Sequence, residues 1–277
     1  MGESELRFAF GKNWQNFVDT CMQDQRIKST VNSLRYLLNT QDLEKKTFLN
    51  IGCGSGLFSL AAYLLGAEKV ISFDYDPDSV QASIRLRERM DIPPEKWEVL
   101  HGSILDNNFF ARLDQADIVY SWGVLYHTGA VWQALDNAIS CLKPGGLLAI
   151  SIYNNVEKRL GGYAFLWRVK RTYNQSSQFI QHFIEHTYVV YFCLGVAITL
   201  RNRFKIIKGY GSDASTRGMD FWHNVRDWVG GFPYEYATAG EVFNDIHDKH
   251  RLGLMFLETH DGHVCNQFTF HKPASSD

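Results

Sequence analysis

The sequence predicts an α/β fold built on a largely parallel β-sheet with helices on both faces. Residues 47–152 alternate short apolar runs with helix-like segments five times, which is the pattern of parallel strands joined by crossover helices. Residues 252–259 and 264–271 read as a sixth and a seventh strand. Thr238 and Glu241 form a capping box, which predicts a helix immediately before these last two strands.

The most informative local motif is a glycine turn. The apolar run 48–51 ends in Gly52, Gly54 and Gly56, and a helix-like segment follows. Glycine lets the backbone adopt a positive φ and approach a nucleotide-like ligand closely. The G-x-G-x-G spacing differs from that of dinucleotide-binding and phosphate-binding loops, and glycine turns also occur without any ligand. The next apolar run ends at Asp74, where a carboxylate can hold the two hydroxyls of a ribose.

The ends of the third and fourth predicted strands also carry residues suited to ligand contact. Ser103 and Ile104 follow the third run, and the fourth run ends at Ser121 and Trp122. The carboxyl ends of parallel strands meet at one rim of a sheet. We therefore expect these residues to converge with the glycine turn and Asp74.

Taken together, these motifs resemble those of class I S-adenosylmethionine (SAM)-dependent methyltransferases. The sequence is similar to a bacterial branch of this class that carries W-G-V-L-[HY]-H-T after the fourth strand and K-P-G-G before the fifth. Here these motifs are residues 122–128 and 143–146. The resemblance covers residues 45–152 and resumes at 217–235 and 265–268. It implies a Rossmann-like seven-stranded methyltransferase sheet with an antiparallel last strand, and SAM as cofactor.

The resemblance also implies which residues hold SAM. Asn50 stands where relatives often carry an acid, and Ser103 where many carry Asp, but an amide oxygen can still accept from the ammonium and a hydroxyl can still bond the adenine. Trp14 either caps the cofactor pocket or packs in the core. The predicted cofactor-binding residues are Trp14, Asn50, Gly52, Cys53, Gly54, Gly56, Asp74, Tyr75, Ser103, Ile104, Ser121 and Trp122.

We expect four regions along the chain. They are an N-terminal helical cap (1–45), a SAM-binding core (46–152), a helical lid insertion (153–216), and an acceptor-site loop with a C-terminal helix and the last two strands (217–277). Within the lid, residues 158–208 hold nine basic side chains and one acidic side chain. This segment is either a lid with solvated charges or a surface that docks a membrane, an acyl chain or an anionic substrate.

Composition excludes several classes of protein. The net charge of −2 gives no global attraction to nucleic acid, which is therefore not expected as a partner. The apolar run 187–200 is shorter than the roughly 20 residues that a spanning helix needs. The five cysteines are scattered without a C-x-x-C pair, and the first residues are polar and charged rather than those of a signal peptide. We expect a cytoplasmic protein with reduced thiols.

Methyl transfer needs alignment of donor and acceptor, and a base helps when the acceptor is a hydroxyl or a protonated amine. His127, after the fourth strand, is the first candidate base, and His223 is the second. Tyr153, just past the fifth strand, is a candidate to face the acceptor. Each of these residues also has a purely structural interpretation, as a helix cap or part of an aromatic cluster.

A metal site is not expected. His260, His263 and Cys265, with His223, form only a minority metal hypothesis, since H-x-C alone lacks the four ligands of a structural zinc site.

The favoured function is methyl transfer from SAM to an O or N atom of a small-molecule acceptor. Three alternatives stay open: a tRNA-modifying transferase, a SAM-binding regulatory subunit, and a SAM-consuming reaction other than methylation, such as cyclisation. The sequence leaves the acceptor and the oligomeric state open.

Overall fold

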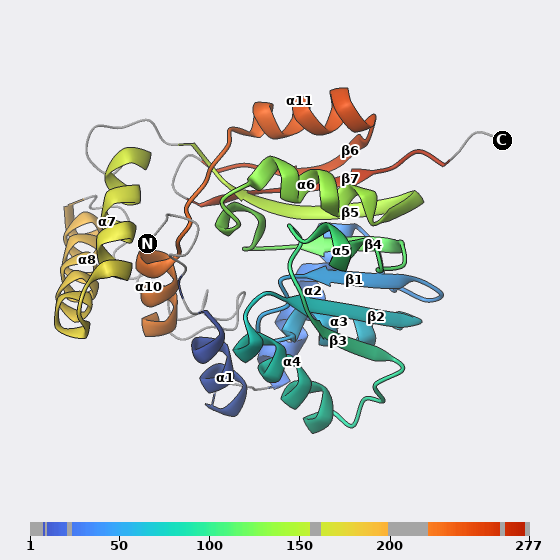
Figure 1. Ribbon diagram of the computed structural model, residues 1–277, viewed down its shortest axis with the longest axis horizontal. Coiled ribbons are helices and arrows are strands. Elements are labelled where there is room, and N and C mark those ends of the chain that lie inside the picture. The colour runs from blue at the N-terminus through green and yellow to red at the C-terminus, as the bar shows by residue number, and fades with distance from the viewer. Residues whose placement is uncertain are drawn as a thin grey trace.

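The computed structural model describes residues 8, 10–20, 24–155, 162–198, 221–260 and 264–274. Its centre is a seven-stranded sheet of order β3-β2-β1-β4-β5-β7-β6 (Figure 1), which confirms the predicted α/β fold. The first five strands are parallel, and β7 is antiparallel to both β5 and β6. The strands are β1 (Thr47–Ile51), β2 (Lys69–Asp74), β3 (Trp97–His101), β4 (Ala116–Ser121), β5 (Leu142–Tyr153), β6 (Gly253–Glu258) and β7 (Cys265–His271).

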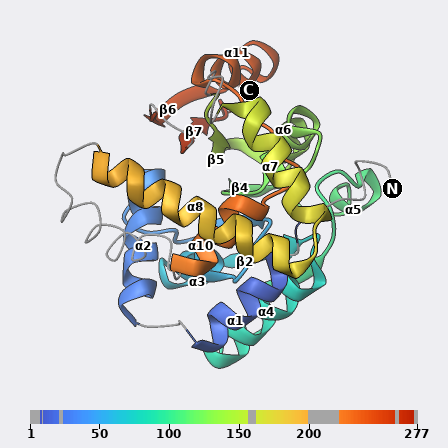
Figure 2. The same ribbon diagram turned by 90° about the vertical axis from the view of Figure 1, so that its left-hand side faces the viewer.

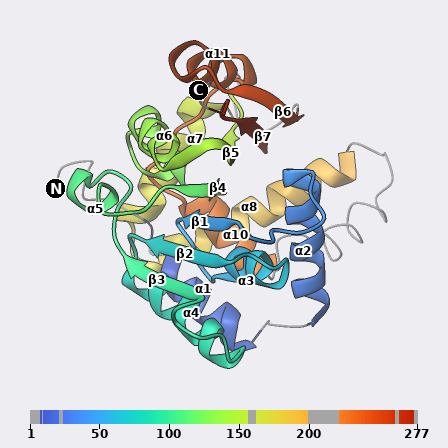
Figure 3. The same cartoon turned by 90° about the vertical axis from the view of Figure 1, so that its right-hand side faces the viewer.

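Helices cover both faces of the sheet. In chain order they are α1 (Phe10–Thr20), α2 (Asp24–Leu38), α3 (Leu57–Leu64), α4 (Pro77–Arg89), α5 (Asn107–Phe110), the single 3-10 turn η2 (Leu125–His127), α6 (Val131–Ser140), α7 (Tyr163–Gln175), α8 (Gln178–Ile198), α10 (Phe221–Gly230) and α11 (Ala239–His250). In Figure 3, α6 and α2 lie on opposite sides of the sheet.

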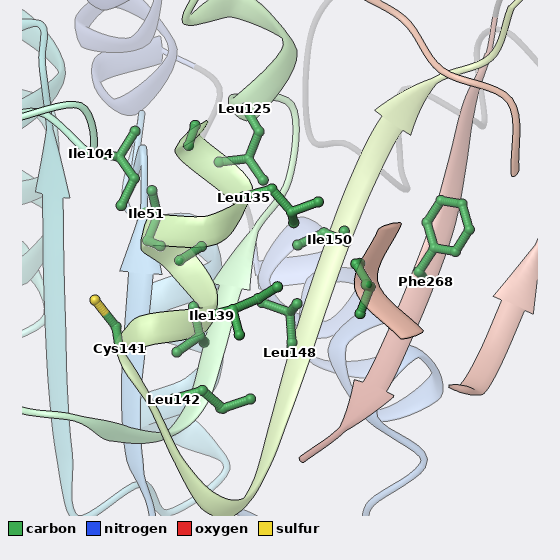
Figure 4. Packing of buried hydrophobic residues seen from close by; sticks show 14 of the residues in the cluster. Ile51, Ile104, Leu125, Leu135, Ile139, Cys141, Leu142, Leu148, Ile150 and Phe268 are labelled. Carbon is green, nitrogen blue, oxygen red and sulfur yellow. The ribbon is translucent and has the colours of Figure 1, made fainter. Parts of the chain in front are cut away.

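Two separate apolar clusters fill the space between these helices and the sheet. On one face α6 and α11 pack against the strands, and Figure 4 shows Leu135 and Ile139 of α6 next to Leu148 and Ile150 of β5 and Phe268 of β7. On the other face α2, α3 and α4 bury a second cluster. The strands are therefore buried on both sides, as parallel sheets require.

The fifth strand is longer than the sequence pattern predicts. We expected it at 147–152 after the K-P-G-G turn, but β5 begins at Leu142 and includes that turn. Gly145 has φ 75°, and Lys143 Nζ lies 2.9 Å from the Asp117 carboxylate of β4. The ladder between β4 and β5 is irregular between Ala116 and Ile118, which absorbs the bend.

Three helices gather at one end of the sheet. Figures 1 and 2 show α7, α8 and α10 together, with α8 crossing in front of the strand ends. Tyr173 donates to Glu185 Oε1 at 2.7 Å, and Arg226 Nε lies 3.5 Å from the other oxygen of that carboxylate. This buried carboxylate joins all three helices. Within the described residues, no helix is long and apolar enough to cross a bilayer.

The region expected as an acceptor-site loop is helical in its first part. Residues 221–230 form α10, because Val225 and Val229 recur at helical spacing and are both buried against the lid. The predicted capping box of α11 is present, with Thr238 Oγ1 accepting from the Glu241 amide at 3.2 Å.

Candidate functional site

The glycine turn after β1 adopts the backbone that its sequence predicts. Gly52, Gly54 and Gly56 have φ values of 71°, 53° and 79°, in the left-handed region that side chains disfavour. The amides of Gly52 and Cys53 donate to the Phe73 carbonyl of β2 at 2.8 and 3.0 Å. The turn is therefore fastened to the neighbouring strand.

Asp74 lies directly beside this turn. Its Oδ2 accepts from the Gly54 amide at 3.0 Å, and its Oδ1 accepts from the Asp76 amide at 2.9 Å. Burial raises the pKa of this carboxyl to about 6, although the backbone amides of Asp76, Gly54 and Tyr75 oppose the shift. Each carboxylate oxygen keeps a further lone pair, which is what a ribose diol would use.

Ser83 of α4 supports the turn and escaped the sequence reasoning. Its hydroxyl lies 3.1 Å from the Gly54 carbonyl and 3.2 Å from Cys53 Sγ. A Cβ at Gly56 would come within 2.9 Å of that hydroxyl. Cys53 is buried, and burial together with the charge of Asp74 raises the pKa of its thiol, so it is inert rather than reactive.

Two side chains close on the turn from different elements. The Trp14 indole of α1 would lie 3.1 Å from a Cβ at Gly54, and Val124 would lie 2.3 Å from a Cβ at Gly52. Helix α1 is held in place at its start, where the Gly11 amide donates to Asp76 Oδ2 at 2.8 Å. Trp14 thus contacts the turn while also packing against the α2–α4 cluster. That it caps the cofactor pocket stays a prediction.

Asn50 belongs to a buried polar chain beneath the turn. Its Nδ2 donates to Ser59 Oγ at 2.8 Å, Ser59 and Ser72 hydroxyls lie 2.7 Å apart, and Trp97 Nε1 donates to Ser72 at 2.8 Å. This chain assigns the amide nitrogen of Asn50 to Ser59 and leaves Oδ1 as the acceptor.

The residues expected at the adenine lie near Asp74 with different exposures. Tyr75 is exposed and its carbonyl contacts His101 Nε2 at 2.9 Å. Ser103 Oγ accepts from the Leu105 amide at 3.2 Å, and Ile104 is buried. Ser103 therefore stabilises its own turn by accepting from the Leu105 amide. Its hydroxyl proton is left to donate to another partner.

Ser121 and Trp122 lie at the end of β4 and are directed toward other strands. Ser121 Oγ donates to the Ile51 carbonyl at 3.2 Å, and Trp122 Nε1 lies 3.4 Å from Gln267 Oε1 of β7. Both contacts link strands at the rim. Their assignment to the cofactor stays a prediction.

His127 and Tyr153 come together in an aromatic cluster, as two neighbours on one rim should. Their ring centroids lie 5.8 Å apart, and Tyr126 lies between them at 4.6 Å from His127 and 4.1 Å from Tyr153. Phe10 of the N-terminal helix lies 5.2 Å from the imidazole. Because Val124 touches the glycine turn, residues 124–127 connect the turn directly to this cluster.

The imidazole of His127 is fixed by one strong contact. His127 Nδ1 lies 2.6 Å from the Pro233 carbonyl, which can only accept, so Nδ1 carries the proton and Nε2 carries the lone pair. Burial lowers the pKa of His127 to about 3, although the Pro233 contact opposes the shift. The imidazole is therefore neutral at physiological pH.

The segment after α10 positions the Pro233 carbonyl against His127. The sequence did not predict this role. Glu235 accepts from the Gly129 and Val131 amides at 2.9 and 3.2 Å, which satisfies the first turn of α6. The Glu235 amide donates to the Tyr126 carbonyl at 3.0 Å. The only sequence signal was the Phe-Pro turn followed by an acidic residue. This pattern does not indicate which residues Pro233 and Glu235 contact.

The remaining candidates are placed less completely. His223 lies on α10, but its side chain falls outside the described part of the structure, as does all of His263. Cys265 Sγ contacts the Tyr126 hydroxyl at 3.3 Å. Among the described residues, no three His, Cys, Asp or Glu side chains are grouped to hold a metal.

The donor and acceptor set at this rim fits SAM. The turn offers side-chain-free backbone, and Asp74 and Asn50 offer acceptors for hydroxyl and ammonium groups. A seven-stranded sheet of this order with such a rim defines a class I SAM-dependent methyltransferase.

Comparison with known families agrees with that class. The chain belongs to the family described as "Methyltransferase domain", whose sequence profile matches residues 22–192. A methyltransferase domain is an enzyme domain, so the chain belongs to a family of enzymes.

Curated relatives match only part of the chain. It is 39% identical over 114 residues to the ribosomal protein L11 methyltransferase of Photobacterium profundum, and 38% identical over 115 residues to that of Tolumonas auensis. Each alignment covers 41% of this chain and 36% of the relative, so the matched part spans about a third of those proteins.

Solved structures match over most of the chain at low identity and show the fold. Magnesium protoporphyrin IX methyltransferase from Synechocystis PCC 6803, with bound SAH, superposes with a TM-score of 0.53 at 11% identity, covering 94% of this chain and 93% of that one. A putative methyltransferase from Haloferax volcanii was solved as a complex with the Trm112 methyltransferase activator. It superposes with a TM-score of 0.52 at 14% identity, covering 97% of this chain and 100% of that one.

Proposed function

We propose that this enzyme transfers the methyl group of SAM to an O or N atom of a small-molecule acceptor. The observation that carries the proposal is the fixed tautomer of His127, whose Nδ1 is held by the Pro233 carbonyl at 2.6 Å. The imidazole lies among Tyr126, Tyr153 and Phe10. It comes three residues after Val124, which contacts the glycine turn. A base with a preset lone pair beside the cofactor rim is the arrangement that such an acceptor needs.

On the cofactor side, the turn of Gly52 and Gly54 would face the amino-acid tail, and Asp74 would bind the ribose. Asn50 would accept from the ammonium, and Trp14 would cover the turn. When bound, SAM supplies a methyl group already activated by its sulfonium. The protein therefore mainly has to position the acceptor and exclude water.

On the acceptor side, His127 would accept a proton at Nε2 as the acceptor oxygen or nitrogen is methylated. Its depressed pKa keeps Nε2 unprotonated at physiological pH. Tyr153 would form the wall beside it. The lid helices α7 and α8 would close over the acceptor.

A protein acceptor is the second candidate, because the partial relatives are ribosomal protein L11 methyltransferases. The test is to incubate the enzyme with SAM labelled in the methyl group and with a bacterial extract separated into small molecules, protein and RNA. We expect label in the small-molecule fraction. Label confined to protein or to RNA would replace this proposal with the corresponding macromolecular acceptor.

The same reaction separates methylation from other uses of SAM. Methyl transfer leaves S-adenosylhomocysteine (SAH), whereas intramolecular cyclisation leaves methylthioadenosine. A regulatory SAM-binding subunit would bind SAM and give neither product. Chromatography of the nucleoside products therefore decides between these alternatives before the acceptor is known.

A further inference from the structure

Lys170 is a charged residue that neither the motifs nor the cofactor rim accounts for. It lies on the lid helix α7, and its side chain is only 1% exposed. Its Nζ donates to the Trp228 carbonyl of α10 and lies 4.8 Å from the ring centroids of both Trp228 and Tyr234. Aromatic faces attract a cation, so these contacts offset part of the cost of its burial.

Among the residues that the structure describes, none balances the charge of Lys170 as a direct counter-ion. Within the described residues, no carboxylate lies within ion-pair distance of Nζ. The titratable groups that face it are Asp227 of α10, Cys265 of β7, Tyr234 and His127. Burial lowers the pKa of Lys170 to about 7, and the charges of Asp227 and Cys265 oppose that shift only in part. Buried ammonium groups normally have a direct partner, because leaving water is costly for them.

Lys170 belongs to the same aromatic cluster as the candidate base. The Tyr234 ring beneath it lies 5.1 Å from Tyr153, and Tyr153 lies 5.8 Å from His127. The charge of Lys170 is close enough to depress the pKa of His127. The lid therefore places the ammonium group of Lys170 near His127, the candidate base on the rim.

We propose that Lys170 binds an acidic oxygen of the acceptor, and that the acceptor carries a carboxylate or phenolate. An anionic oxygen would give Nζ the direct counter-ion that the described protein lacks, through a charge-assisted hydrogen bond. This inference rests on the proposed function, since it names the acceptor class of the same site.

The test uses benzoate and its neutral isostere benzamide as probes. Calorimetric titrations of the full chain are run at pH 6.0 and 8.5, with and without SAH. At pH 6.0 we expect benzoate to bind about tenfold more tightly than benzamide, the effect of one charge-assisted contact. The ratio should fall toward one at pH 8.5, as Lys170 loses its proton while His127 stays neutral at both values. In Lys170→Met the ratio should be near one at both pH values.

Matched variants keep the result specific to this residue. Lys249→Met removes an exposed lysine of α11 and should leave the benzoate preference unchanged. Lys170→Arg keeps the charge at pH 8.5 and should retain the preference there. If Lys170→Met fails to fold, the pH series on the unaltered protein and on Lys170→Arg still decides the question.

Equal affinity for the two probes at pH 6.0, or a preference that survives in Lys170→Met, would overturn the inference. SAH binding is measured in the same titrations and reports on the proposed function by itself. SAH binding without benzoate preference means that the acceptor class is wrong and the transferase proposal stands. Absence of SAH binding means that the transferase proposal fails, whatever the probes do.

Discussion

Replacing Asp74 by Asn should separate the cofactor-binding role of this residue from its structural role. Each carboxylate oxygen accepts one backbone amide, from Gly54 and from Asp76. The amide side chain keeps the shape, but its nitrogen must face one of these two donors, and it has no charge to offer a ribose diol. Losing a hydrogen bond to a charged group costs about 1.5–3 kcal/mol, which corresponds to a roughly 10- to 150-fold weaker affinity for SAH.

The structural part of the effect is predicted separately. One backbone donor left facing another donor costs about 1–3 kcal/mol of folding free energy. Asp106→Asn is the control for an Asp-to-Asn change without that cost, since the amides of Asn108 and Phe109 both donate to Oδ1 of that exposed carboxylate and an amide oxygen can accept both. Calorimetric titration with SAH and thermal unfolding are measured on both variants. An affinity within twofold of the unaltered protein in Asp74→Asn would refute the ribose-binding role.

Four further outcomes follow from the same geometry. The affinity for SAH should be constant from pH 8.5 to 7 and fall as the pH drops through about 6, because protonation of Asp74 removes the charge that accepts the diol; titrations across this range check it. His127→Asn keeps a donor for the Pro233 carbonyl but loses Nε2, so single-turnover assays should show a loss of about 10²- to 10⁴-fold with SAH affinity unchanged. Gly52→Ala should abolish SAH binding, because its Cβ would lie 2.3 Å from Val124 in a backbone that side chains disfavour; this is read by titration alongside circular dichroism. Thr238→Ala should cost about 0.5–2 kcal/mol by removing the α11 cap and lower the melting temperature without changing SAH affinity.

Controls distinguish each of these from general damage. The pH dependence should disappear in Asp74→Asn and persist in Asp106→Asn. If His127→Asn retains full turnover, the imidazole is a structural element of the aromatic cluster and the base lies elsewhere. A normal SAH affinity in Gly52→Ala would mean that the turn does not approach the cofactor.

The strands and their common rim could be predicted from sequence because they depend on local signals. Glycine at 52, 54 and 56 indicates a backbone conformation directly, and Asp74 is the last residue of a buried strand. The start of helix α11 could be predicted because its capping box consists of two side chains three residues apart in the sequence.

The parts that escaped prediction depend on contacts between distant segments. A loop was expected at the start of residues 217–277, yet α10 forms because the lid covers its apolar face. Ser83 looks like any helical serine until the turn is placed against it. The partner of His127 is a backbone carbonyl 106 residues further on, and a carbonyl carries no side-chain signature. The burial that sets the pKa of Lys170 arises only when α7, α10 and the following segment meet.

The position of β7 has a consequence for biosynthesis. This strand comes last among the seven but lies inside the sheet, between β5 and β6. Its partner β5 ends at Tyr153 and pairs with Cys265, so the edge of β5 stays open on the ribosome while more than a hundred intervening residues are translated. Exposed strand edges recruit other chains. A nascent chain stalled after the lid should therefore need a chaperone, and release of residues 265–271 should relieve that need.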